Sequence, residues 1–306
     1  MPSAPSVSAS TTHYWPWKGL TICYQQSGTK GSPILLVHGF GAHSAHWRKN
    51  LPALGQQHRV YAIDLVGYGQ SDKPKPGEVI DYTFETWGEQ VLAFCREVIG
   101  EPTYMAANSI GCVVAMQAAV MAPDWVTGLV LIDCSLRLLH DRKRQMLPWY
   151  RSVPTPYIQK ILNYRPLGQF FFARLATPRT VSRVLKQAYG RPEAVTDELV
   201  QLLLAPASDP NAVDVFLSFI SYSQGPIPED LLPQLTCPTH IIWGEVDPWE
   251  PLALARAYEH YPAVQDFVVL PGIGHCPQDE APEQVNPLIL DWVEADLQAT
   301  QQKNTP

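Results

Sequence analysis

Short apolar runs alternate with helical patterns through the first 135 residues, and this alternation constrains the fold more than any other feature. Each run is continuously apolar or rich in β-branched residues, as in parallel strands that are covered on both faces. Helical patterns lie between the runs, near 45–55, 84–99 and 110–121. The alternation predicts a doubly wound, mostly parallel α/β sheet. Its first strands are expected at P-I-L-L-V (33–37), R-V-Y-A-I-D (59–64), P-T-Y-M-A-A (102–107) and G-L-V-L-I-D (128–133).

The alternation stops after Cys134. Residues 136–228 are rich in aromatic residues and proline and carry no strong strand pattern. Beyond them the chain returns to T-H-I-I-W-G (239–244), D-F-V-V-L-P (266–271) and a closing helix near 283–298. Ligands of open α/β sheets bind at the carboxyl edge of the strands, so a helical insertion here is expected to form part of the site.

We therefore expect one sheet domain with an inserted helical cap. The domain comprises residues 13–135 and 229–298, and residues 136–228 form the cap over the carboxyl edge of the sheet. Residues 1–12 and 299–306 are expected to be disordered tails. A chain of 306 residues is long enough to bury the large core that this domain needs.

Charge and cysteine usage restrict the class of protein. The net charge of −7 argues against general nucleic-acid binding, because no overall positive field would attract phosphates. No secretory signal and no apolar run long enough to span a bilayer is visible. The cysteines form no C-x-x-C pair and lie in apolar runs, which favours reduced thiols in a reducing compartment. They are Cys23, Cys95, Cys112, Cys134, Cys237 and Cys276.

Ser109 lies between a predicted strand and a predicted helix. This is the context of a nucleophile elbow, in which a strained turn exposes the serine hydroxyl. The usual motif is G-x-S-x-G, and here Gly111 satisfies the second glycine while Ala107 replaces the first. The alternative is a serine with only a packing or capping role.

The segment His38-Gly39-Phe40-Gly41 follows the strand at 33–37 directly. In α/β-hydrolases the loop at this place donates one backbone N–H to the oxyanion hole, and the residue after the nucleophile donates the other. Phe40 and Ile110 would be these donors. The alternative is a plain glycine turn.

The acid and the base are expected in the last two loops. Asp247 lies in W-G-E-V-D-P-W-E-P after the strand at 239–244, and His275 lies in G-I-G-H after the last strand. Asp133, after an earlier strand, and Glu245 are rival acids. The order Ser109, Asp247, His275 is the order of the α/β-hydrolase triad, with Asp247 orienting the imidazole that takes the serine proton.

Other chemistry has little support. Dehalogenases and epoxide hydrolases of this fold carry aspartate at the elbow, whereas this chain carries serine, which favours an acyl-serine intermediate. His43 and His46 have no cysteine or acidic partner at ligand spacing, so we treat them as loop residues near the mouth of the site and expect no metal. No dinucleotide fingerprint occurs, and no cofactor is expected.

The cap carries its own charge. Residues 142–192 contain eleven Lys and Arg residues and no Asp or Glu, while the rest of the chain holds the other 11 basic residues and all 29 acidic ones, a net charge of −18. Aromatic residues among basic ones suit the surface of an anionic membrane. The alternative is a charged face that docks on the acidic core. The aromatic residues are Trp149, Tyr150, Tyr157, Tyr164, Phe170, Phe171 and Phe172.

Three stretches resemble chlorophyll dephytylases, the plant and cyanobacterial α/β-hydrolase group related to pheophytinase. They are A-V-D-V-F-L-S-F-I-S-Y-S-Q-G-P-I-P-E-D-L-L-P-Q-L (212–235), W-G-E-V-D-P-W-E-P (243–251) and D-F-V-V-L-P-G-I-G-H-C-P-Q-D-E-A-P-E-Q-V-N-P-L-I (266–289). The elbow N-S-I-G is similar as well, although that group usually has glycine where this chain has Ala107.

The resemblance implies an α/β-hydrolase fold and hydrolysis of the phytyl ester of chlorophyll or pheophytin, giving chlorophyllide or pheophorbide and phytol. It implies Ser109, Asp247 and His275 as the catalytic residues, and a place on the cytoplasmic side of a thylakoid or other photosynthetic membrane. A generic lipophilic carboxylesterase, a C–C bond hydrolase and a non-catalytic binding protein remain alternatives.

Overall fold

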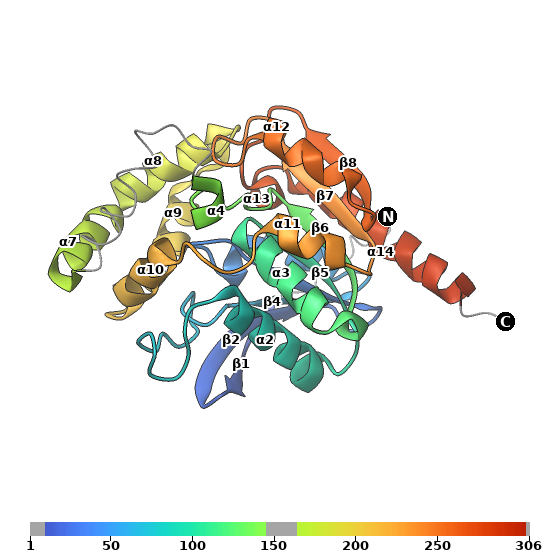
Figure 1. Cartoon of the computed structure of the whole chain (residues 1–306), viewed down its shortest axis with the longest axis horizontal. Helices are drawn as coiled ribbons and strands as arrows, with labels where there is room; N and C mark the ends of the chain where they lie inside the picture. Colours follow the sequence, from blue (N-terminus) through green and yellow to red (C-terminus); the bar gives the residue numbers. More distant parts are fainter. Residues whose placement is uncertain (1–9, 145–163, 304–306) are drawn as a thin grey trace, which may run out of the picture.

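The computed structural model describes residues 10–144 and 164–303. An eight-stranded sheet forms the centre, in the order β1-β2-β4-β3-β5-β6-β7-β8 (Figure 1). The six strands from β4 to β8 are parallel, whereas β1 and β2 pair antiparallel at one edge. The strands are β1 (Thr11–Trp17), β2 (Leu20–Ser27), β3 (Pro33–Val37), β4 (Arg59–Ile63), β5 (Thr103–Asn108), β6 (Val126–Ile132), β7 (Thr239–Gly244) and β8 (Val264–Leu270).

Helices cover both faces of the sheet, as the continuously apolar strands require. One face packs on α2 (Phe84–Phe94), α3 (Ile110–Met121) and α11 (Pro228–Leu231). The other packs on α1 (Leu51–Leu54) and α14 (Pro282–Lys303). Two short helices, α12 (Leu252–Ala255) and α13 (Pro277–Glu280), follow β7 and β8.

Between β6 and α11, in the region 136–228 expected to be the cap, the regular elements that the structure describes are all helices. We call this region the inserted segment. Figure 1 shows its four longer helices grouped on one side of the sheet. Leu185, Leu199 and Cys276 belong to a small buried cluster that joins the segment to the loop after β8. Its helices are α4 (Asp141–Arg144), α7 (Arg165–Leu175), α8 (Pro178–Ala188), α9 (Asp197–Leu204) and α10 (Ala212–Ser221).

Two of the predicted boundaries are wrong. Thr11 and Thr12 were expected in a tail, but they pair with Gln26 and Gln25 in the β1–β2 hairpin. The hairpin turns at Lys18 and Gly19, both at positive φ. At the other end, residues 299–303 continue α14 and are not a tail. Residues 1–9 and 304–306 lie outside the described residues.

Two further expectations concern the cysteines and membrane-spanning helices. All six cysteines are free and buried. Among the helices that the structure describes, none is long and apolar enough to cross a membrane.

Candidate active site

Ser109 sits in a strained turn between β5 and α3, at the carboxyl edge of the sheet. Its φ of 56° lies in the left-handed region, where a residue with a side chain is rarely stable without support. That support comes from its neighbours. Its N–H donates to the Ile132 carbonyl at 3.0 Å, and its carbonyl accepts from Cys112 and Ser135 at 3.1 and 3.2 Å. The backbone therefore holds the serine at one place in the fold.

The small residues around Ser109 have different steric demands. A Cβ on Gly111 would lie 2.6 Å from the carbonyl oxygens of both Val37 and His38, so no side chain fits there. A Cβ on Gly39 would lie 3.1 Å from the Cβ of Ser109. Ala107, by contrast, is fully buried in β5 and packs in the core between the sheet and α3. The elbow thus needs Gly111, and a methyl group at residue 107 is accommodated.

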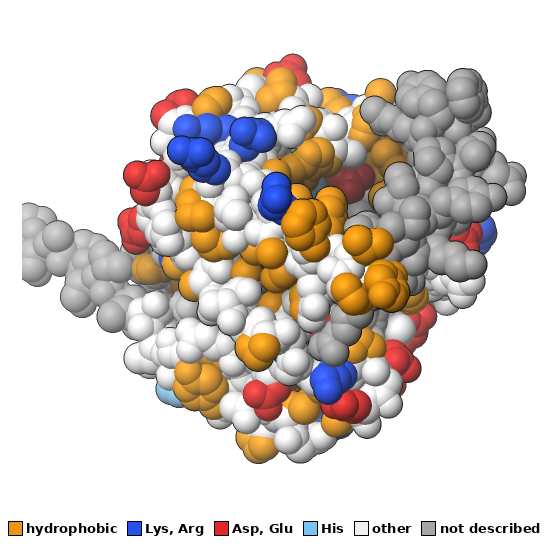
Figure 2. Space-filling model, turned by 90° about the vertical axis from the view of Figure 1, so that its left-hand side faces the viewer, with side chains coloured by type: hydrophobic (Ala, Val, Ile, Leu, Met, Phe, Trp, Pro, Cys, Tyr) orange, Lys and Arg blue, Asp and Glu red, His pale blue; other side chains and the backbone are white. Residues whose placement is uncertain are grey.

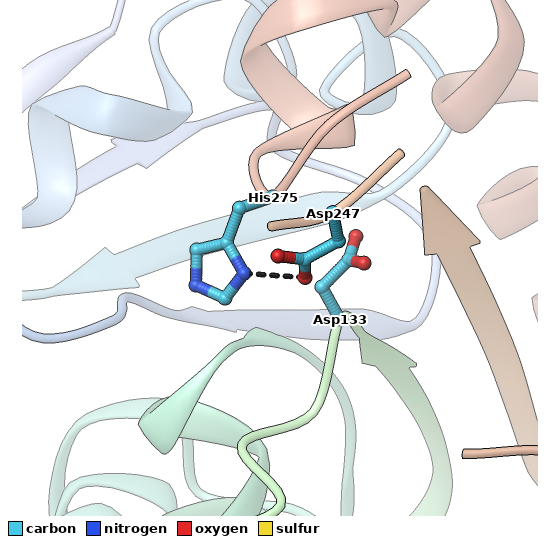
Figure 3. A group of neighbouring side chains, drawn as sticks. All are labelled: Asp133, Asp247 and His275. Carbon is cyan, nitrogen blue, oxygen red and sulfur yellow. Dashed lines mark hydrogen bonds and ion pairs between the residues drawn. The ribbon is translucent and has the colours of Figure 1, made fainter. Parts of the chain in front are cut away.

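His275 and Asp247 form a buried hydrogen-bonded pair. The Nδ1 atom of His275 lies 2.7 Å from Oδ2 of Asp247 (Figure 3). Oδ1 of Asp247 accepts the N–H groups of Trp249 and Glu250 at 2.8 and 3.1 Å. Burial acts to raise the pKa of Asp247, but the bond to His275, the attraction between the two charges and the two backbone donors outweigh it and lower that pKa. Asp247 is therefore held as a carboxylate.

Asn108, which the sequence pattern does not predict as a site residue, fixes the His275 loop to the elbow. Nδ2 of Asn108 donates to the carbonyls of His275 and Ile132 at 3.1 and 3.2 Å. The His275 N–H donates to the Ala188 carbonyl of the inserted segment at 2.8 Å. The only signal for Asn108 in the sequence is its place directly before Ser109.

The rival acids occupy other positions. Glu245 is exposed and accepts the N–H of Gly272 at 2.9 Å, so it braces the loop after β8. Asp133 is fully buried beside Asp247 and accepts the N–H of Gly244 at 2.9 Å. Of the three acids weighed from the sequence, Asp247 is the one hydrogen-bonded to His275.

The two expected oxyanion donors, Phe40 and Ile110, both line the cavity that contains Ser109. Ile110 is the first residue of α3, so its N–H has no partner within the helix. His38 fixes the other loop. Its Nε2 accepts the Leu65 N–H at 3.1 Å, and its Nδ1 lies 2.8 Å from the Gly39 carbonyl. Burial lowers the pKa of His38 to about 4, so it acts as a neutral brace, a role that the sequence did not predict.

A cavity of about 740 Å³ opens in front of Ser109 and His275. Its walls come from the sheet loops and from α7, α8 and α10, and they are mainly apolar. Phe40 stacks on Phe219 at 4.4 Å between ring centroids, which joins the loop after β3 to the inserted segment. Representative wall residues are Phe172, Leu175, Val181, Leu185, Phe216 and Phe219.

One group of possible metal ligands exists in the described residues, and it contains the hydrogen-bonded pair of Asp247 and His275. Single atoms of Asp133, Asp247 and His275 lie within 4.8 Å of one another. His43 and His46 are not part of it. Both are buried, and both contact the inserted segment. Nε2 of His43 lies 3.0 Å from the Leu202 carbonyl oxygen, and Nε2 of His46 lies 3.1 Å from the Tyr189 hydroxyl.

A model of the Alpha/beta hydrolase family matches residues 34–288, which is most of the chain. The chain belongs to this family. The match runs from β3 to α14 and includes the elbow, the His275 loop and the inserted segment.

Curated relatives of different activity are similar to it. Chloroplastic pheophytinase of Arabidopsis thaliana is 26% identical over 94% of this chain, and the acetyltransferase component of the acetoin cleaving system of Pseudomonas putida is 30% identical over 88%. The chain spans 67% and 65% of the lengths of these two proteins. The pimeloyl-[acyl-carrier protein] methyl ester esterase of Aliivibrio salmonicida is 28% identical over 84% of this chain and 90% of its own length.

Solved structures agree on the fold. A serine hydrolase involved in carbazole degradation superposes with a TM-score of 0.75 at 19% identity, over 94% of this chain and 100% of that chain. An esterase from Thermogutta terrifontis gives a TM-score of 0.71 at 25% identity, over 90% of this chain and 94% of that chain. A membrane phospholipase A gives 0.73 at 23% identity, over 94% and 86%.

Proposed function

We propose that this protein is a serine ester hydrolase that cleaves a large lipophilic ester of the chlorophyll phytyl type. The observation that carries the proposal is the apolar cavity that holds Ser109 and His275 together, with Asp247 hydrogen-bonded to His275. No cofactor is needed for this chemistry.

Ester cleavage follows from the positions of these groups. Asp247 occupies Nδ1 of His275, so Nε2 is the nitrogen that accepts the proton when Oγ of Ser109 attacks the ester carbonyl. The N–H groups of Phe40 and Ile110 stabilise the oxyanion. His275 then gives its proton to the departing alcohol, phytol. The acyl group of the pigment is now bound to Ser109 as an ester. Water activated by His275 releases the acid and restores the serine.

The cavity supports a large substrate. At about 740 Å³ it lies in the upper part of the usual range for ligand sites, and its aromatic and aliphatic walls suit a terpenoid chain. The similarity to pheophytinase, whose name refers to a chlorophyll-derived pigment, supports the same class of substrate. Cleavage of a generic lipophilic ester and C–C bond hydrolysis on the same fold are the alternative functions.

Incubation with chlorophyll a or pheophytin a in detergent micelles tests the substrate. We expect release of phytol together with chlorophyllide or pheophorbide, and complete loss of release in Ser109→Ala. A p-nitrophenyl ester serves as the control for esterase activity. Turnover of that ester without phytol release would overturn the pigment substrate, and full activity in Ser109→Ala would overturn the mechanism.

We further propose that α7 and α8 contact an anionic lipid surface. Large apolar side chains are exposed on or next to α7: Tyr164, Leu167, Phe170 and Phe171. The Arg174 guanidinium lies over the Phe170 ring, 4.8 Å from its centroid. Figure 2 faces this side of the molecule and shows apolar side chains beside groups of Lys and Arg. Other aromatic and basic residues of the predicted basic stretch lie outside the described residues: Trp149, Tyr150, Arg151, Tyr157 and Lys160.

Charge separates this surface from the rest of the inserted segment. Basic residues at the two ends of the basic stretch form ion pairs with the sheet domain, as the alternative of docking on the acidic core predicts. The pairs are Arg142–Asp230, Lys143–Glu229 and Arg191–Glu283. Four exposed residues form no ion pair with any residue that the structure describes. They are Arg174, Arg179, Arg183 and Lys186. At roughly 1 kcal/mol each, they would hold the protein weakly and reversibly on an anionic bilayer.

The same two helices line the cavity. Val184 of α8 is 40% exposed and also lines the cavity, and Phe172 and Leu175 of α7 line it too. A lipophilic ester could therefore pass from a bilayer into the cavity along α7 and α8. Flotation with vesicles that contain anionic lipid tests the contact.

We expect co-flotation of the wild type and its loss when Arg174, Arg179, Arg183 and Lys186 are changed to Glu. Lys30→Glu with Arg96→Glu is the control on other faces. Absence of co-flotation, or equal binding by the α7–α8 variant, would remove the lipid proposal. Self-association of the wild type in place of vesicle binding would point to a second copy of the chain as the partner.

A further inference from the structure

Asp133 is a buried acid beside the catalytic pair, and the proposed reaction does not use it. It follows β6 at a positive φ of 43° and is fully buried. Figure 3 shows Asp247 between the His275 imidazole and the Asp133 carboxyl group. Oδ1 of Asp133 accepts the N–H of Gly244, whereas Oδ2 has no hydrogen-bond partner in the described part of the chain.

One carboxylate oxygen of Asp133 lies within 4.8 Å of one of Asp247. Ionising both carboxyl groups at this separation in a buried site has a high free-energy cost. Asp247 has three donors, His275 Nδ1 and the N–H groups of Trp249 and Glu250, and Asp133 has one. The charge therefore resides on Asp247. Burial first, and then the neighbouring Asp247 charge, raise the pKa of Asp133 well above its usual range.

We propose that Asp133 is a neutral carboxylic acid whose Oδ2–H donates a hydrogen bond to the Asp247 carboxylate, so that it positions Asp247 against His275. The bond gives the unpaired Oδ2 a partner. It also explains why the acid after β6 and the acid after β7 coexist, because one carries the charge and the other carries the proton.

The other groups around Asp133 fit a neutral acid. Glu250 and Cys276 face the same site. Burial raises the pKa of Glu250 to about 7, and it raises the pKa of the Cys276 thiol well above its usual value. His275 and Asp247 complete the set. An ionised Asp133 would add a second negative charge to a buried site that already holds Asp247.

Asn is the variant that distinguishes the two states. In Asp133→Asn, Oδ1 can still accept from Gly244 and Nδ2 can donate to Asp247, which reproduces the neutral acid. We expect kcat/KM for a p-nitrophenyl ester within about threefold of the wild type, with an unmoved acidic limb of the pH profile. Asp247→Asn should lose about 10³- to 10⁴-fold. Asp133→Leu, which has no donor, should lose at least tenfold, and the Asn variant should restore that loss.

A loss in Asp133→Asn as large as that in Asp247→Asn, or a displaced acidic limb, would overturn the inference, because both outcomes require a charged Asp133. The positioning role rests on the proposed ester hydrolysis, but the protonation state does not, and it can be measured without turnover. A folded state that keeps a proton lost on unfolding becomes less stable as pH rises.

Relative to the wild type, Asp133→Asn should therefore gain about tenfold in the folding equilibrium constant for each pH unit between 5 and 7. Glu250 titrates in both proteins and cancels from the difference. A stability difference that does not change with pH would show an ionised Asp133. If no ester is hydrolysed or Ser109→Ala stays active, the proposed function fails while this measurement still decides the state of Asp133.

Discussion

At the scale of single residues, the elbow shows which small side chain matters. Gly111 faces two backbone carbonyl oxygens that cannot move away, whereas Ala107 occupies a place in the core that its methyl group fills. The departure from G-x-S-x-G at Ala107 is therefore sterically harmless. Its position two residues before Ser109 says less about its effect on the elbow than the contacts of its Cβ atom.

We predict opposite outcomes for two substitutions of a single methyl group. Gly111→Ala should displace the elbow and lower esterase activity about 100-fold, because a shift of about 1 Å at a catalytic group has an effect of that size. Ala107→Gly should keep activity within a few-fold and lower the free energy of unfolding by about 1 kcal/mol. Kinetics with a p-nitrophenyl ester and urea unfolding measure both. An inactive but folded Ala107→Gly would contradict this steric account.

We predict that Glu250 makes ligand binding depend on pH. It lines the cavity, and burial raises its pKa to about 7, with opposing effects from His275 and the N–H of Leu136. Below pH 7 the group is neutral and the cavity is more apolar. Above pH 7 a carboxylate faces the ligand, so the Kd of an unreactive apolar alcohol should rise, by about tenfold at pH 8 if only the neutral form binds.

Glu250→Gln should make that Kd independent of pH between 6 and 8, and Glu245→Gln, an exposed residue of the same loop, should leave the dependence intact. Calorimetric titration at several pH values measures the change. The same Kd at pH 6 and pH 8 in the wild type would show that Glu250 does not reach the ligand.

At the scale of helices and strands, a buried polar chain joins the inserted segment to the sheet domain. The Tyr189 hydroxyl donates to Oδ2 of Asp279 at 2.9 Å and meets Nε2 of His46 at 3.1 Å. Arg48 forms an ion pair with the same Asp279 at 2.8 Å. Burial lowers the pKa of His46 to about 4, so its neutral ring donates to the hydroxyl.

Tyr189→Phe removes the central hydroxyl and leaves buried polar groups without a partner. We expect a loss of about 1–3 kcal/mol in the free energy of unfolding. The matched control is Tyr164→Phe, which alters the same group at an exposed position and should change stability by less than about 0.5 kcal/mol. Equal effects in the two variants would show that the chain of bonds adds nothing to stability.

The sequence was sufficient for the elements whose pattern is local. The strands from β3 to β8 and helices α2, α3 and α14 follow from apolar runs and helical spacing. The β1–β2 hairpin does not follow from the sequence pattern because β1 is mostly exposed and the strands join at Lys18-Gly19, which is a weak turn signal. Asn108 and His38 were missed as braces because their partners, His275 and Leu65, are distant in the sequence.

At the scale of the whole molecule, charge is segregated. The chain has a net charge of −7, which on average would repel an anionic surface. The stretch 142–192 contains eleven basic and no acidic residues, and four of these side chains, on α7 and α8, are exposed and form no ion pair with any described residue. At physiological salt the Debye length is about 8 Å, so a surface feels the nearest charges and not the molecular total.

This segregation predicts that salt separates two activities of one catalytic site. Turnover of a lipophilic ester embedded in anionic vesicles should fall steeply as salt rises from about 0.02 to 0.5 M, because screening weakens the contact of α7 and α8 with the lipid. Turnover of a p-nitrophenyl ester in water should stay constant, since Ser109 and His275 are unchanged. Vesicles of neutral lipid should show low turnover and little salt dependence. If both substrates responded equally to salt, the effect would lie in the catalytic site, and the basic surface would have no part in substrate delivery.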